Sequence, residues 1–340
     1  MILRSLAAVL AWAVVAPAWS AETPKPKVSL QKSNDFIRVE INGELFTQYW
    51  FTMKNHPAIE KAKDGSYSTN AARHTYFWPI LGPGGVRMTR DWPMVPFSEG
   101  EDHDHKHHRG LWYAHGSVNG IDFWSEDSKA GRVRHKQFSE VKSGDDAGVI
   151  RETCEWAAPD GRVVMTDERT MRFLPGPGTS RYLDFDITFK APADREVVFG
   201  DTKEGSMAIR VNEDLRLTHG KKPGTGKIEL STEVRDQQTW GKRATWCDYS
   251  GPLNGKVVGV ALFDHPSNPV HPTWWHVRDY GLFAANPFGV HDFEKKPAGT
   301  GNLVIGAGRS VTFRYRFMFH EGDAAAAGVA ARYSEFAPAP

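Results

Sequence analysis

The chain has 340 residues, with 42 Lys and Arg against 41 Asp and Glu. This balance lacks the excess of positive charge that nucleic-acid binding requires, so we do not expect DNA or RNA as a partner. Aromatic residues are abundant, including 12 Trp and 19 Phe, and broad aromatic faces suit contact with sugars. Any single aromatic residue is nevertheless more often part of a core than of a binding surface.

The N-terminus has the pattern of an export signal. Met1 to Arg4 carries one positive charge, Leu6 to Ala16 is almost wholly apolar, and small residues lead to Ser20. The apolar core is shorter than the roughly 20 residues that span a bilayer, so the pattern predicts a cleaved signal peptide over 1–20. A short anchor or a buried helix is the alternative. We expect a periplasmic or extracellular protein that has no membrane contact after cleavage.

The rest of the chain is expected to form one domain. Its length would suit two average domains, but β-sandwiches of 200 to 300 residues also fold as one unit, and no long linker or fixed-period repeat divides this sequence. We predict a linker over 21–27, a single β-domain over 28–320 and a C-terminal helix and tail over 321–340. Alanine-rich Asp323–Phe336 is the clearest helical segment.

Alternating apolar residues predict long strands in the second half of the chain. The segments Arg181–Phe189 and Ser310–Phe319 both place apolar side chains at odd positions, which then share one buried face. Asn-Gly or Asp-Gly pairs at 42–43, 119–120, 160–161 and 254–255 are typical of tight hairpins. The sequence therefore predicts an antiparallel, all-β fold.

The cysteines leave two alternatives open. Cys154 and Cys247 are far apart in sequence and are the only two in the chain. An exported protein meets oxidants that can join them in a disulfide, whereas a domain of this size is also stable with two buried free thiols. No catalytic role is expected for either residue.

Five of the fourteen histidines lie between positions 103 and 115, in the run Glu101–Gly116. Imidazoles titrate near neutral pH and are common metal ligands, so this segment predicts proton transfer or a divalent metal site. His103 and His105 also fit a solvated loop. His108, Arg109 and His115, close to Gly110 and Trp112, are favoured as site residues.

Two further segments are rich in functional side chains. The segment Gly200–Arg210 places Asp201, Lys203, Glu204 and Arg210 around Gly205, where opposed charges can tune a general base; a surface turn of ion pairs is the alternative. The segment Asp264–Gly289 is rich in proline and presents a second group of candidates, namely His276, Arg278, Trp274, Trp275 and Asn286. Trp faces stack on sugars, and Arg and Asn bind hydroxyl groups, so the combination suits carbohydrate.

These segments resemble a known bacterial family of unknown function, often labelled methane oxygenase PmoA-like. The resemblance covers roughly Phe46 to Phe319 and rests on several short motifs: His107–Gly116, Val118–Trp124, Thr202–Gly205, Trp246–Gly251, Asp264–Pro266 and Asn286–Gly289. The methane-oxygenase label does not fit, because that membrane subunit is a bundle of spanning helices and this chain has no such segment after its signal. The resemblance implies a two-sheet supersandwich similar to that of galactose mutarotases, whose sites use a His and a carboxylate.

The sequence therefore predicts an exported carbohydrate-active enzyme, of epimerase, lyase or hydrolase type. In this hypothesis His108 or His115 is the acid, Glu204 is the base, and Arg109 and Arg278 stabilise negative charge on oxygen. Trp112 and Trp275 are expected to form a stacking floor. Substrate contacts are expected from Asp201, Lys203, Arg210 and Asn286, and His276 is a further catalytic candidate.

Two other classes of protein remain as alternatives. A metal-dependent oxidoreductase would need two histidines and one carboxylate around a metal ion with open positions, which the histidine-rich run can supply although its spacing is not diagnostic. A divalent ion that assists the sugar enzyme itself would be bound by His105, His107 or His108 together with His276 and would polarise a hydroxyl or carbonyl group. A non-catalytic sugar-binding protein would use the Trp and Arg residues without the histidines.

Overall fold

The computed structural model describes residues 27–52, 59–61, 67–69, 72–95, 98 and 100–338. The predicted signal peptide and all but the last residue of the predicted linker lie outside these residues. No helix within the described ranges is long and apolar enough to cross a membrane.

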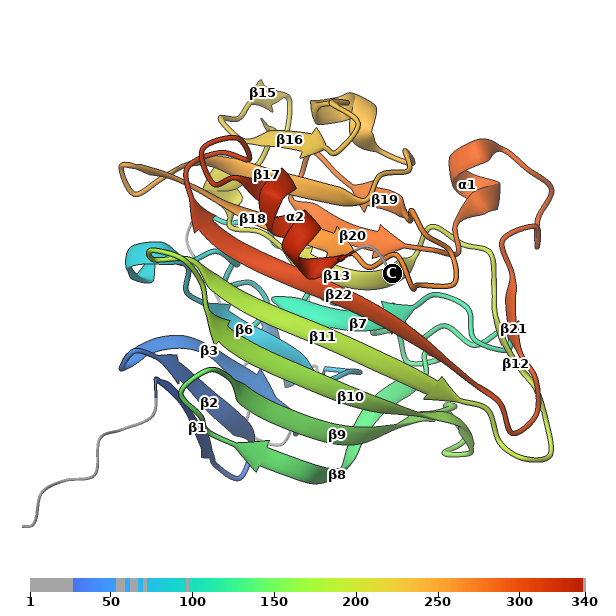
Figure 1. The fold of residues 1–340 in the computed structure, drawn as a ribbon. Coiled ribbons are helices and arrows are strands. Elements are labelled where there is room, and N and C mark those ends of the chain that lie inside the picture. The colour runs from blue at the N-terminus through green and yellow to red at the C-terminus, as the bar shows by residue number, and fades with distance from the viewer. Residues whose placement is uncertain are drawn as a thin grey trace, which may run out of the picture.

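Two eight-stranded antiparallel sheets face each other (Figure 1). The first sheet runs in the order β1 (Val28–Lys32), β2 (Phe36–Ile41), β3 (Glu44–Trp50), β6 (Tyr76–Ile80), β7 (Leu111–His115), β13 (Gly205–Arg210), β20 (Leu282–Asn286) and β19 (Trp274–Val277). The second sheet runs in the order β16 (Lys227–Leu230), β17 (Trp246–Leu253), β18 (Lys256–Asp264), β22 (Ser310–Glu321), β11 (Arg181–Lys190), β10 (Val163–Pro175), β9 (Gly148–Ala157) and β8 (Arg132–Lys142). The predicted all-β, antiparallel two-sheet supersandwich is confirmed.

Smaller elements complete the fold. Three strand pairs lie outside the large sheets: β4 (Ile59–Lys61) with β5 (Tyr67–Thr69), β12 (Val197–Phe199) with β21 (Leu303–Ile305), and β14 (Thr218–His219) with β15 (Lys222–Pro223). The helices are α1 (Val290–Glu294), α2 (Val329–Phe336) and the 3-10 turns Pro83–Gly85, Glu213–Leu215 and Asp236–Thr239.

The alternation predicted for the long strands is confirmed. Leu183, Phe185, Ile187 and Phe189 of β11 are buried between the sheets. The odd positions of β22 from Phe313 to Phe319 are buried in the same core. Each such side chain contributes about 1.5–3 kcal/mol through burial, so this shared face is the main source of stability.

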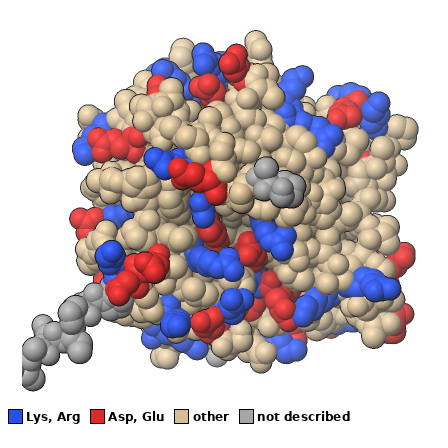
Figure 2. Space-filling view, viewed as in Figure 1, with Lys and Arg blue, Asp and Glu red and all other residues tan. Residues whose placement is uncertain are grey.

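The C-terminal helix is shorter than predicted. Gly328 takes a left-handed conformation (φ +66°), so α2 begins only at Val329 and residues 324–328 form turns. The helix packs on the outer face of the second sheet, where Tyr333 and Phe336 contact Phe263 (Figure 1). On the face that carries α2, Lys and Arg are interspersed with Asp and Glu, as the balanced composition leads one to expect (Figure 2).

Three of the four predicted turns join neighbouring strands. Asn42-Gly43 joins β2 to β3, Asp160-Gly161 lies between β9 and β10, and Asn254-Gly255 joins β17 to β18. In Asn42-Gly43 and Asn254-Gly255 both residues have positive φ, as the tightest hairpin turns require. Asn119-Gly120 makes a smaller turn, closed by a bridge between Val118 and Ile121.

Cys154 and Cys247 are both buried free thiols. They lie on β9 and β17, which are strands of the second sheet separated by four others. The free-thiol alternative is therefore the one that the structure supports.

Candidate active site

Strand register builds a hollow on the outer face of the first sheet. Five residues lie side by side across β6, β7, β13, β20 and β19, namely Tyr76, Trp112, Ala208, Ala284 and His276. The two alanines in the middle of this row are small, whereas Trp112 and His276 on either side are large. The outer face is therefore depressed over β13 and β20.

A cavity of about 600 Å³ opens above this hollow. It is lined by His105, His107, His108, Gly116, Asp122, Trp124, Ser125, Lys203, Glu204, His276, Arg278 and Tyr280. The structure therefore brings together residues from all three segments that the sequence singled out. We call this cavity the histidine pocket.

The histidine segment is fixed by a buried arginine and a glycine. The guanidinium of Arg90, which is wholly buried, donates to the Asp104 carboxylate and to the backbone oxygens of Asp104 (2.8 Å) and His105 (3.0 Å). Gly110 then turns the chain into β7 with a φ of +54°, and a Cβ there would lie 2.0 Å from the Phe77 oxygen. Only glycine fits this close approach.

Replacing Gly110 with alanine is therefore expected to displace the whole histidine segment. The added methyl group meets backbone rather than a flexible side chain, so the strain cannot be relieved locally. We expect the variant to lose about 2 kcal/mol or more of unfolding free energy, measured by urea denaturation. Gly120→Ala is the matched control, because Gly120 also has positive φ but has open space around it. Equal losses in the two variants would contradict this account of Gly110.

His105 is oriented by a carboxylate. Its Nδ1 donates to Asp104 Oδ2 at 2.7 Å, which leaves Nε2 as the ring atom available to a ligand. Burial acts to raise the pKa of Asp104, but the hydrogen bond from His105 and the charges of Arg210 and Arg90 outweigh it, so the pKa lies well below its ordinary value. Asp104 is therefore a permanent anion that holds the His105 ring in one tautomer.

His108 is held neutral beneath His105. The two rings stack with centroids 4.7 Å apart, and Arg210 NH1 lies 3.2 Å from His108 Nδ1. An arginine can only donate, so Nδ1 is the acceptor and the proton of the neutral ring is on Nε2. Burial, followed by the neighbouring His107 and Arg210, lowers the pKa of His108 well below its ordinary value. His108 is thus a neutral hydrogen-bond donor rather than an imidazolium acid.

His107 and His276 are neutral as well. Burial and the neighbouring His105 lower the pKa of His107 to about 3. Burial, with the charges of Arg278 and Lys203, lowers the pKa of His276 to about 3. Neutral imidazoles both donate and accept hydrogen bonds, which suits a ligand that is rich in hydroxyl groups.

The lowered pKa of His276 predicts an acid-sensitive fold. Below about pH 6.5 the unfolded chain binds a proton at this ring, whereas the folded chain does not until about pH 3. Stability should therefore be complete above pH 6.5 and fall as the pH drops toward 3, by up to about 1.4 kcal/mol per pH unit for one such ring. Urea midpoints at pH 7 and pH 5 should differ less in His276→Gln than in the wild type. An unchanged difference would contradict the buried, neutral state of His276.

Lys203 and Glu204 form the opposite wall of the histidine pocket. Their side chains pair at 2.5 Å (Lys203 Nζ to Glu204 Oε1), and each is about two-fifths exposed. The loop is anchored where Lys203 N donates to Asp292 of α1 (2.7 Å) and Glu204 O accepts from Gly116 N (2.6 Å). Glu204 is therefore a solvent-accessible carboxylate on an anchored loop, and its Oε2 makes no hydrogen bond or ion pair with the described residues.

Arg278 and Tyr280 close one end of the pocket. The Arg278 guanidinium lies over the rings of Tyr280 (5.4 Å) and Trp240 (5.9 Å). Tyr280 also stacks on His105, with centroids 5.1 Å apart. Burial raises the pKa of Tyr280, so its phenol is a hydrogen-bond donor at neutral pH.

Several predicted site residues lie beneath the pocket rather than in its lining. Arg109 is wholly buried and pairs with Glu126 through two hydrogen bonds of 2.5 and 2.8 Å, so it is not placed to meet a substrate. Arg210 is wholly buried against Asp104 and His108. Trp112 is buried under His108, with ring centroids 5.3 Å apart. These residues support the lining instead of forming it.

Four other predicted residues lie outside the lining of the pocket. His115 points into the core, where its Nε2 lies 2.8 Å from Gly200 O and burial lowers its pKa to about 4. Trp275 is also in the core, since it follows Trp274 with the opposite orientation along β19, and donates to Ala244 O. Asp201 and Asn286 hold loops by accepting from backbone N–H groups. The core positions of His115 and Trp275 do not allow them to line the pocket, and the side chains of Asp201 and Asn286 stabilise loops next to it.

The predicted metal ligands do not form a metal site. His105, His107 and His108 pack ring against ring, with centroids 4.5 to 5.8 Å apart, instead of aiming nitrogens at one point. Arg210 occupies Nδ1 of His108, and Asp104 occupies Nδ1 of His105. Among the residues that the structure describes, no three His, Cys, Asp or Glu side chains form a metal-binding group.

Sequence reasoning missed Asp104, Tyr280, Asp122 and Trp124. Asp104 could have been found from its position directly before His105, since a catalytic histidine often donates a hydrogen bond to a neighbouring carboxylate. Asp122 and Trp124 lie in the motif Val118–Trp124, but nothing in its residue pattern indicates a role for either of them. Tyr280 carries no such signal, because only the turn after β19 brings it over His105.

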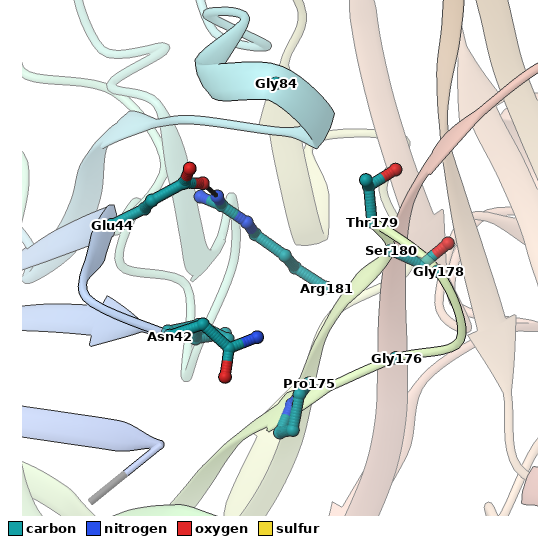
Figure 3. Close-up of a pocket in the computed structure, with 10 residues that line it drawn as sticks. Asn42, Glu44, Gly84, Pro175, Gly176, Gly178, Thr179, Ser180 and Arg181 are labelled. Atoms are coloured by element: carbon teal, nitrogen blue, oxygen red, sulfur yellow. Dashed lines mark hydrogen bonds and ion pairs between the residues drawn. The ribbon is translucent and has the colours of Figure 1, made fainter. Parts of the chain in front are cut away.

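A second cavity, of about 250 Å³, lies between the β2–β3 turn and the β10–β11 turn (Figure 3). Arg181 points into it, but its guanidinium already bonds to Glu44, to Leu45 O and to Leu81 O. Glu44 is the carboxylate in this lining, and the cavity contains no histidine. The histidine pocket is therefore the better candidate for acid-base chemistry.

Comparisons with solved structures find carbohydrate-active enzymes at low similarity. A polysaccharide lyase matches with a TM-score of 0.30 and 12% identity over 89% of this chain and 34% of its own. A 4-alpha-glucanotransferase from Thermococcus litoralis matches with a TM-score of 0.27 and 9% identity over 88% of this chain and 40% of its own. A glycoside hydrolase family 97 enzyme from Pseudoalteromonas sp. strain K8, solved in complex with acarbose, matches with a TM-score of 0.26 and 10% identity over 87% of this chain and 34% of its own. The chain thus spans about a third to two-fifths of the length of these proteins.

A comparison with curated proteins finds no match. A family model does match, and it covers residues 37–334, which is nearly the whole described domain. It carries no methane-oxygenase label, so the resemblance to the PmoA-like family stays a prediction, while membership in a family of unknown function is confirmed. The chain belongs to the family of unknown function DUF6807.

Proposed function

We propose that the histidine pocket binds a carbohydrate and transfers protons on it, by epimerisation, elimination or hydrolysis. One observation carries the proposal. His105, whose ring is oriented by the Asp104 carboxylate, lines the same pocket as the solvent-accessible carboxylate of Glu204. Two proton-transfer groups on one cavity are what acid-base catalysis requires.

The groups have distinct roles in this proposal. His105 takes or gives a proton at Nε2, because Asp104 holds its Nδ1–H. Glu204 is the complementary acid or base through Oε2. His108 remains neutral and donates its Nε2–H to a sugar oxygen, which stabilises negative charge that develops there. Tyr280, which is partly exposed, offers aromatic surface to the sugar ring.

A screen of glycan binding and conversion tests this proposal. The mature protein is incubated with a panel of neutral, acidic and sulfated polysaccharides and oligosaccharides, with binding followed by calorimetry and products by mass spectrometry. We expect one glycan class to be bound and converted, and Glu204→Gln to bind it but convert it at least a hundredfold more slowly. Glu168→Gln, at an exposed carboxylate on β10, is the matched control. Lack of both binding and conversion across the panel would contradict the proposal.

A further inference from the structure

A third, smaller cavity adjoins the histidine pocket. It has a volume of about 180 Å³ and is lined by Asp236, Gln237, Trp240, Val277, Arg278 and Asp279. Arg278 lines both cavities, so its side chain lies at the boundary between them. We call this cavity the Trp240 pocket.

Trp240 has the features of a sugar-stacking residue. Its ring is partly exposed and is supported from the side by Phe293, with centroids 5.2 Å apart. Its Nε1 is buried and has no hydrogen-bond partner within the described part of the chain. Since Nε1 is closed to solvent, the exposed part of the ring is the surface that this cavity offers to a sugar.

Arg278 is a cation without a counter-ion. Among the described residues no carboxylate lies within 4 Å of its guanidinium, which instead lies over two aromatic rings. Of the nearby anions, Glu204 pairs with Lys203 and Asp236 accepts from Ile228 N, while Asp279 lines the Trp240 pocket without an ion pair to Arg278. His107, His108 and His276 are neutral, so the positive charge in the lining of the histidine pocket comes from Arg278 and from Lys203, which is paired with Glu204.

We propose that the two cavities are adjacent subsites for one oligosaccharide whose anionic group, a uronate carboxylate or a sulfate ester, pairs with Arg278. The inference rests on the proposed carbohydrate function and adds the substrate class. The Trp240 pocket, at about 180 Å³, has room for about one sugar unit, so a ligand that occupies both cavities extends over two units or more. Arg278 is the group best placed to distinguish acidic from neutral chains, since planar guanidinium groups bind carboxylate and sulfate through two hydrogen bonds.

Calorimetric titration of the mature protein tests this inference with four probes. These are galacturonate tetrasaccharide, sulfated carrageenan tetrasaccharide, cellotetraose and galacturonate monosaccharide. We expect one of the two acidic tetrasaccharides to bind about tenfold to a hundredfold more tightly than cellotetraose, and which one does so distinguishes carboxylate from sulfate. Arg278→Gln should abolish this preference, and Arg162→Gln, at an exposed arginine distant in sequence, should keep it.

A comparison of tetrasaccharide and monosaccharide affinity tests the Trp240 pocket separately. Trp240→Ala should weaken the tetrasaccharide about tenfold and leave the monosaccharide unchanged, because a single unit occupies only the histidine pocket. Thermal unfolding confirms that both variants are folded. Equal affinity for acidic and neutral tetrasaccharides would overturn the inference while the carbohydrate site stands. Failure of every probe, together with failure of the whole glycan panel, would overturn the proposed function as well.

Discussion

Replacing His105 with asparagine is expected to lower turnover by about 10²- to 10⁴-fold, which is the usual contribution of a general acid or base. Asparagine retains an N–H that can donate to Asp104, as His105 Nδ1 does, but it has no counterpart of Nε2. The variant should therefore fold and bind as the wild type does, and lose only the proton transfer. The measurement is the initial rate on the glycan that the wild type converts, with binding followed in parallel.

His103→Asn is the matched control for this variant. His103 is exposed and stacks on Trp92, with centroids 4.2 Å apart, outside the histidine pocket. Its replacement should leave the rate within about twofold of the wild type. Equal loss in the two variants, or full activity in His105→Asn, would show that His105 is not the proton-transfer group.

Removing Glu126 is expected to cause the largest loss of stability. Glu126 is the buried partner of Arg109, and Glu126→Ala leaves a buried cation without its counter-ion. Breaking such a pair from one side costs about 3–5 kcal/mol of unfolding free energy. Urea denaturation at pH 7 measures the loss.

A double variant separates the ion pair from simple packing. Arg109→Met/Glu126→Leu replaces both charges by apolar groups and should recover most of the stability lost in Glu126→Ala, because no unpaired charge remains. A double variant as unstable as the single one would contradict a structural role for this pair. That result would also favour the original prediction that Arg109 contacts a substrate.

Strand alternation made most of the fold predictable from the sequence. The pattern in β11 and β22 identified a shared buried face, and paired turn residues such as Asn254-Gly255 located hairpins. These signals are local, because each of them lies within one short range of residues. The length of α2 was less predictable, because Gly328 and its left-handed conformation outweighed the helical preference of the alanines before it.

The candidate site was predictable only in part. The three functional segments were recognised by composition, yet the face on which each side chain lies depends on strand register. Thus His115 and Trp275 point into the core, while His276, opposite Ala284, lines the pocket. The neutral state of His108 also depends on a contact with Arg210, 102 positions away, which no local pattern reveals.

The mass of the product tests the central claim most directly, namely that the histidine pocket transfers protons on a carbohydrate. The wild-type protein is incubated with the bound oligosaccharide in D₂O and in ¹⁸O-labelled water, and the products are analysed by mass spectrometry. The account predicts one of three results, each absent with His105→Asn: cleavage with gain of one water, cleavage without gain of water that leaves an unsaturated fragment, or one solvent deuterium on carbon. A product that has lost two hydrogen atoms by oxidation, or tight binding with no conversion, would contradict it.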